Sequence, residues 1–161
     1  MNGFNRSYLV WITIAATLGG FLFGYDTAVI SGAIKSVKNY FSLNDAQEGW
    51  AVANALIGCI IGAIAAGYVS QALGRKLSLM LSAVLFFVSA LGSATANVFA
   101  VFIAFRLIGG IGIGLASMLS PMYIAEVSPA KYRGRMVSLY QMAIVTGIFL
   151  VFWVNYVIAR Q

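Results

Sequence analysis

The sequence has no histidine, a single cysteine and only four acidic residues. Without histidine, imidazole metal sites and histidine proton relays are excluded. Cys59 lies in an apolar run and has no second cysteine to pair with inside the chain, so it is best interpreted as a small buried hydrophobe. Charged residues make up 9% of the chain and hydrophobic residues 61%, and the mean hydropathy is +0.93. Soluble domains carry about a quarter charged residues, so this composition predicts an integral membrane protein.

The basic residues do not indicate nucleic-acid binding. The formal net charge is +6, but the lysines and arginines form short clusters between apolar runs instead of one stripe, which is typical of loops that face anionic lipid. A glycine-rich run over 109–114 does not fit a dinucleotide loop, because Leu115 stands where the last glycine of G-x-G-x-x-G belongs and no strand precedes it. We therefore expect no enzyme activity, no cofactor and no metal site.

Five apolar segments are long enough to cross a bilayer, which takes about 20 residues each. They cover roughly 8–31, 49–70, 77–96, 98–124 and 136–158. The first is too long for a signal peptide, and four more spans follow it. The fold class is therefore predicted to be all-α and integral to the membrane. Small residues at four-residue spacing predict close helix packing, at Gly20 and Gly24, Gly58, Gly62 and Ala66, and Gly110 and Gly114.

The distribution of lysine and arginine near the segment ends predicts the orientation. One side of the membrane holds six basic residues, and the other side holds three. The six are Arg6, Arg75, Lys76, Lys131, Arg133 and Arg135, and the three are Lys35, Lys38 and Arg160. The richer side is expected to be cytoplasmic, so the sequence predicts a multi-pass protein of the cell membrane with a cytoplasmic N-terminus.

Two charged residues, Asp26 and Arg106, lie well inside the apolar segments, where a charge costs a few kcal/mol unless it is paired or wetted. At 1.5 Å per residue they lie about 6–8 Å and about 12 Å from the outer ends of their segments, so a buried pair is possible. An aspartate that alternates between an arginine partner and a proton can couple proton flow to a conformational change. A static structural pair, or an Asp26 that merely reaches the outer surface, fits the sequence equally well.

Three motifs resemble the sugar porters of the major facilitator superfamily. They are Phe23-Gly24-Tyr25-Asp26, the run from Arg106 to Gly114, and Pro121-x-Tyr123-x-Ala125-Glu126-x-x-Pro129-x-x-x-Arg133-Gly134. The stretches 19–32 and 108–126 are especially similar to bacterial D-xylose–proton symporters. The resemblance implies transport of a monosaccharide, pentose or hexose, coupled to protons by alternating access.

The resemblance also implies roles for individual residues. Asp26 matches the proton-coupling carboxylate of the family, and Arg106 matches its partner. Phe23 and Gln141 match residues that line the sugar site. A cytoplasmic gate is implied at Gly67, Gly74, Arg75, Lys76, Glu126 and Arg133.

The chain departs from the family pattern in two residues and in length. Ala72 stands where the signature loop has an arginine, which should weaken the gate, and Ile148 stands where xylose symporters often have a second glutamine. The family has twelve helices in two halves, whereas five are predicted here. We therefore expect the N-terminal portion only, which lacks helix six and needs the C-terminal half as its partner to transport. A small membrane protein that assists assembly, or an inert truncated remnant, is the alternative.

Overall fold

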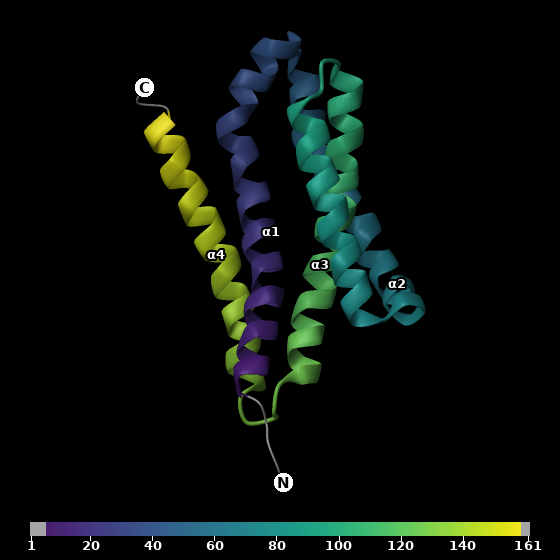
Figure 1. Cartoon of the computed structure of the whole chain (residues 1–161). Helices are drawn as coiled ribbons and strands as arrows, with labels where there is room; N and C mark the ends of the chain where they lie inside the picture. Colours follow the sequence, from purple (N-terminus) through teal and green to yellow (C-terminus); the bar gives the residue numbers. More distant parts are fainter. Residues whose placement is uncertain (1–5, 159–161) are drawn as a thin grey trace.

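The computed structural model describes residues 6–158, which form four helical elements. These are α1 (Arg6–Phe41), α2 (Asp45–Ala94), α3 (Phe99–Val127) and α4 (Arg133–Ile158). Figure 1 shows the helices running along roughly one direction, with α1 beside α4 and α2 beside α3. Arg160, which contributed to the predicted orientation, lies outside the described residues.

The second element folds back on itself at Gly74 (Figure 1). A straight helix of 50 residues would be about 75 Å long, more than twice the roughly 30 Å of a bilayer core. Gly74 has φ 78° and ψ 163°, a conformation that is essentially restricted to glycine. Across the turn, the Ser78 hydroxyl donates to the Val69 carbonyl at 3.1 Å. The first arm (45–73) and the second arm (75–94) correspond to the predicted segments 49–70 and 77–96.

The predicted apolar segment ends at residue 31, whereas the helix α1 continues to Phe41, ten residues beyond it. Its last turns pack Val37 and Phe41 on a buried cluster that contains Phe102, which stabilises the extension. The next helix then starts with a capping box: the Asn44 side chain accepts from the Gln47 amide at 2.8 Å, and the Gln47 side chain accepts from the Asn44 amide at 3.0 Å. The other helix ends lie within about four residues of the prediction.

Glycines bring the helices into backbone contact at two crossings. A Cβ at Gly24 of α1 would collide with the Ile144 carbonyl of α4, and a Cβ at Gly58 of the first arm would collide with the Leu107 carbonyl of α3. Reciprocal glycines on the partner helices make the same approach: Gly147, Gly110 and Gly114. The predicted close packing is therefore confirmed at Gly24, Gly58, Gly110 and Gly114, and Gly147 is a further position that was not predicted.

The outer surface of the bundle is apolar. Among the described residues, α2, α3 and the segment Arg133–Val157 are long and apolar enough to cross a membrane. Large side chains such as Ile64 and Phe149 are about two-thirds exposed. This inversion of a soluble protein's surface suits a lipid environment, in which the helices satisfy their own backbone hydrogen bonds.

Candidate functional site

A buried ion pair joins α1 to α3. Arg106 Nη1 donates to Asp26 Oδ1 at 3.0 Å, and the two side chains are only 10% and 20% exposed. Within the part of the chain that the structure describes, the buried Nε of Arg106 has no hydrogen-bond partner. The structure therefore brings the two predicted residues together, and the Nε–H of the guanidinium is a buried donor without a partner among the described residues.

The position of this pair follows from the helices that carry it. Ile30, one turn after Asp26, and Phe102, one turn before Arg106, belong to one buried apolar cluster. The cluster lies beside the pair toward the end of α1. Asp26 is fifteen residues before Phe41, about 22 Å along the helix. An Asp26 that simply reaches the outer surface was one of the open alternatives; in the structure its side chain is 20% exposed and is paired with Arg106.

Phe23 and Gln141, the residues matched to a sugar site, lie on the adjacent helices α1 and α4. Phe23 is half-buried one turn before Asp26, and its carbonyl accepts from the Thr27 hydroxyl at 2.8 Å. Gln141 is exposed. No residue among 6–158 covers the Gln141 amide. Phe23 and Gln141 can therefore form only one side of a binding site.

A second ion pair lies at the end of the bundle that holds the α2 turn. Arg75 Nη2 lies 3.1 Å from Glu126 Oε1, and Arg75 Nε donates to both carboxylate oxygens at 3.2 and 3.3 Å. The same guanidinium donates through Nη1 to the hydroxyl of Ser70, which is buried. Arg75 thereby links both arms of α2 to the last turn of α3.

The other predicted gate residues are not all part of this contact. Gly67 has open space where a Cβ would stand, and so has Gly74. Lys76 and Arg133 are exposed. The sequence reasoning missed Ser70, although its hydroxyl in an apolar segment five residues before Arg75 was the available signal. It also missed Asn54, which is fully buried on the first arm and donates to the Ile103 carbonyl of α3 at 2.8 Å.

At the opposite end of the bundle, Lys38 joins α1 to α2. Its ammonium lies 2.7 Å from Asp45 and 2.6 Å from Glu48, so the last turn of α1 is tied to the first turn of α2. The pKa of Lys38 is raised, first by its hydrogen bond to Asp45 and then by its hydrogen bond to Glu48. The hydrogen bond from Lys38 in turn lowers the pKa of Asp45. All three groups lie near the surface, so salt weakens the contact.

Comparison with known proteins identifies the family. The family described as sugar (and other) transporters matches residues 12–161. The D-xylose-proton symporter of Escherichia coli (strain K12) is 50% identical over 184 residues, covering 98% of this chain and 38% of that protein. The arabinose-proton symporter of Bacillus subtilis (strain 168) is 42% identical over 157 residues, covering 98% of this chain and 34% of that protein.

The fold is shared as well. A solved structure of the major facilitator superfamily proton:xylose symporter, bound to 6-bromo-6-deoxy-D-glucose, matches with a TM-score of 0.90 and 49% identity over 98% of this chain and 39% of that chain. The chain thus spans well under half the length of the relatives it matches. It is an all-helical, multi-pass membrane protein and not an enzyme. From the family match over residues 12–161 and the shared fold, we conclude that the chain belongs to the sugar transporter family of the major facilitator superfamily.

Proposed function

We propose that this chain forms the first five membrane-spanning helices of a proton-coupled monosaccharide transporter and works together with a C-terminal half. The spans are α1, the two arms of α2, α3 and α4, and the N-terminus lies in the cytoplasm. Proton-coupled sugar transport is what the names of the E. coli and B. subtilis relatives describe. The expected substrate class is a pentose or hexose.

The observation that carries this proposal is the buried pair of Asp26 and Arg106. A carboxylate that binds a proton loses its Coulomb attraction to the guanidinium, which stays charged at any pH the protein meets. Because the pair joins α1 to α3, protonation weakens the contact between these two helices. Phe23 is one turn away on α1, so a sugar on its ring would meet the same helix that responds to the proton.

The pair of Arg75 and Glu126 is proposed as the cytoplasmic gate, with Gly67, Gly74, Lys76 and Arg133 around it. Its side chains are 34% and 46% exposed, so it contributes little to stability and can open at low cost. A contact of this kind suits a gate. Ala72 offers no guanidinium for a second bond, which makes this gate weaker than the family pattern implies.

Transport in proteoliposomes tests the proposal. The chain is co-expressed with the remainder of the E. coli D-xylose-proton symporter, purified as a complex, and assayed for D-xylose accumulation driven by an inward proton gradient. Asp26→Asn should abolish accumulation while sugar exchange across the membrane persists, because an amide cannot carry the proton. Thr27→Val is the matched control: its hydroxyl bonds only within α1, so accumulation should be retained.

Two results would contradict the proposal. Accumulation of D-xylose by the Asp26→Asn complex would remove the coupling role. Proton-driven uptake by the 161-residue chain alone would remove the need for a C-terminal half.

A further inference from the structure

The buried amide of Asn54 has a hydrogen-bond acceptor that nothing uses. Asn54 is 1% exposed on the first arm of α2, and its Nδ2 donates to the Ile103 carbonyl of α3 at 2.8 Å. This bond fixes which way the amide faces, because a carbonyl can only accept. Asn54 Oδ1 is buried and has no hydrogen-bond partner among the described residues. A buried acceptor without a partner is costly inside an apolar span, so its presence needs a reason.

Asn54 lies in the same layer of the bundle as the ion pair. Toward the end of the bundle that holds Lys38, one buried apolar cluster joins α1, the first arm and α3 through Ile30, Ala51 and Phe102. One turn farther from that end, the same three helices carry Asp26, Asn54 and Arg106. An apolar layer is thus followed by a polar one, in which the two buried atoms without partners are a donor, Arg106 Nε, and an acceptor, Asn54 Oδ1.

The first arm contacts α3 on both sides of Arg106. A helical carbonyl points toward the residue four positions on, so the Asn54 amide that binds the Ile103 carbonyl lies at the level of Arg106. One turn after Arg106, a Cβ on Gly110 would meet the Ala55 carbonyl of the first arm. The guanidinium of Arg106 is carried on three flexible methylene groups, which allow it to turn toward α1 or toward the first arm.

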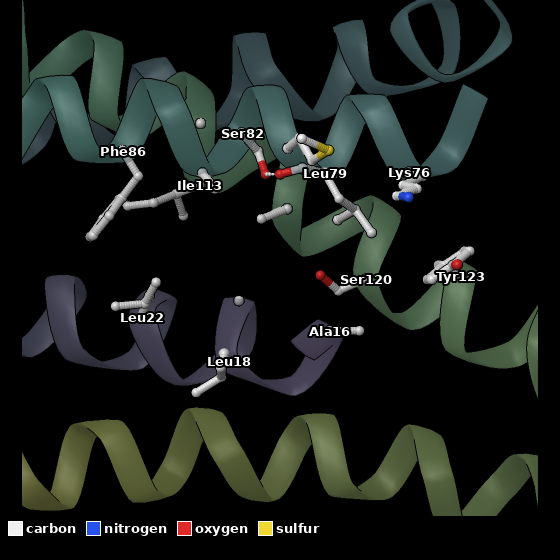
Figure 2. A pocket seen from close by; sticks show the side chains of 15 residues that line it. Ala16, Leu18, Leu22, Lys76, Leu79, Ser82, Phe86, Ile113, Ser120 and Tyr123 are labelled. Atoms are coloured by element: carbon white, nitrogen blue, oxygen red, sulfur yellow. Dashed lines mark hydrogen bonds between the residues drawn. The ribbon is translucent and has the colours of Figure 1, made fainter. Parts of the chain in front are cut away.

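A groove elsewhere in the bundle does not supply a partner for Arg106. It runs between α1, the second arm of α2 and α3, encloses about 560 Å³ and is lined mainly by apolar side chains, with Ser120 pointing into it (Figure 2). Asp26, Asn54 and Arg106 do not line it. In the layer of Arg106 itself, the side-chain acceptors are the Asp26 carboxylate, which is already bound, and Asn54 Oδ1, which is not.

We propose that Asn54 is a positioning residue that receives the Arg106 guanidinium when Asp26 binds a proton. While Asp26 is charged, it holds the guanidinium against α1, and Asn54 Oδ1 stays unpaired. A proton from the water phase neutralises Asp26, and Arg106, which stays charged, turns a donor to Asn54 Oδ1. The bond from Asn54 to the Ile103 carbonyl is kept in both states. Protonation of Asp26 is part of the proposed function, on which this inference rests.

This exchange changes which helices the buried cation holds together. Before protonation Arg106 joins α3 to α1, and afterwards it joins α3 to the first arm, whose backbone already contacts α3 at Gly58 and Gly110. A hydrogen bond from a charged donor offsets the cost of a buried guanidinium without a carboxylate partner. Asn54 therefore stabilises the protonated state, and it should raise the proton affinity of Asp26 about tenfold.

Other charges lie too far along the helices to take over this role. The nearest are Lys35, nine residues beyond Asp26 on α1, and Glu48, six residues before Asn54 on the first arm and already held in an ion pair. Residues 136–158 of α4 carry no charge. The other titratable side chains near this level of the packed helices, all neutral at pH 7, are Tyr25, Cys59 and Tyr140.

Infrared titration of the purified full chain in lipid nanodiscs tests the inference. The protonated carboxyl of Asp26 gives a C=O stretching band, which is followed against pH and assigned by its absence in Asp26→Asn. The chain has only four acidic side chains, and the other three lie in the first turn of α2 and the last turn of α3, so the band can be resolved. Asn54→Leu should lower the titration midpoint by about one pH unit, because the protonated state loses the acceptor for Arg106. Asn54→Ala should shift it in the same direction, and it keeps the test decisive if Asn54→Leu does not fold.

Ser89→Ala is the matched control for a merely structural role. Ser89 is buried on the second arm and, like Asn54, donates to a carbonyl of α3, that of Phe105, at 2.6 Å. Its loss removes an interhelical bond beside Arg106 without changing the first arm, so the midpoint should not move. Asn54→Ser retains a hydroxyl oxygen that can accept, and its midpoint should lie closer to the wild-type value than that of Asn54→Leu.

An unshifted midpoint in Asn54→Leu and Asn54→Ala would overturn the inference, and so would an equal shift in Ser89→Ala or the absence of any band that depends on Asp26. The outcome is separable from that of the transport assay. If the midpoint shifts as expected but the complex does not accumulate D-xylose, only the proposed transport fails. If the complex accumulates D-xylose and the midpoint does not shift, only the role of Asn54 fails.

Discussion

Removal of Asp26 should destabilise the bundle because it leaves a buried cation behind. At 3.0 Å and an effective dielectric constant of about 20, the attraction between Asp26 and Arg106 is roughly 5 kcal/mol before desolvation is subtracted. Arg106 is only 10% exposed and cannot lose its proton, so Asp26→Ala leaves its desolvation cost without compensation. We expect Asp26→Ala to lower the free energy of unfolding by about 3–5 kcal/mol.

The double variant separates charge from packing. Asp26→Ala with Arg106→Met removes both charges and keeps an unbranched apolar side chain in place of the arginine. This variant should be more stable than Asp26→Ala alone by about 2 kcal/mol, since replacing a whole buried pair is far less costly than breaking it. Arg106→Met alone should be the milder single change, because Asp26 is twice as exposed and can become neutral by binding a proton.

Equilibrium unfolding in mixed detergent micelles, followed by helical circular dichroism at fixed pH and salt, gives the four free energies of a double-mutant cycle. Glu126→Gln is the control for an exposed pair and should cost less than about 1 kcal/mol, because the Arg75–Glu126 side chains are 34% and 46% exposed. If the effects of Asp26→Ala and Arg106→Met simply add in the double variant, the two charges do not stabilise one another and the reasoning fails.

Three further changes probe the helix contacts by the same unfolding measurement. Gly58→Ala should lower the free energy of unfolding by about 1–3 kcal/mol, because the added Cβ would collide with the Leu107 carbonyl. Gly67→Ala is the control and should be neutral or slightly stabilising, because a Cβ there meets open space. Equal effects of the two substitutions would contradict the backbone contact. Gly74→Ala should cost about 1–3 kcal/mol through its φ of 78° alone, and an unchanged stability would show that the turn can rearrange. Lys38 lowers the pKa of Asp45 below the usual 3.8. The contact between Lys38 and Asp45 therefore stabilises the fold above pH 3.8, and this stability is lost as the pH falls through the lowered pKa of Asp45. Wild type should therefore lose stability more steeply than Lys38→Met below about pH 4, and parallel pH profiles would exclude the contact.

Much of the fold is predictable because the length and apolar composition of each helix show that it lies in lipid. An apolar run long enough to span a bilayer has to satisfy its backbone internally, so the segments 98–124 and 136–158 predicted α3 and α4 closely. The end of α1 was not predictable in this way. Lys35 and Lys38 are as compatible with a helix as with a loop, and the extension depends on packing against Phe102 and on the carboxylates of the next helix.

The candidate site also contains residues that the sequence predicts and residues that it does not. The cost of a charge in an apolar segment pointed to Asp26 and Arg106, and the structure pairs them. Their role in proton coupling remains a prediction, as do the roles of Phe23 and Gln141. Ser70 was missed although it lies only five residues before Arg75, because the contact forms only once the chain turns back at Gly74. The groove beside Ser120 likewise exists only once three helices are placed together.

The two glycine crossings have a mechanical consequence. Carbonyl-to-glycine contact locks α1 to α4 and α3 to α2, so each pair should move as one rigid body. The less extensive packing of α1 on α3 is then the compliant joint of the bundle, and the pair of Asp26 and Arg106 crosses it, while Lys38 ties α1 to the start of α2 at one end. Under the proposed coupling, a proton on Asp26 would remove the charge attraction at this joint and so loosen the one contact about which the two helix pairs can turn.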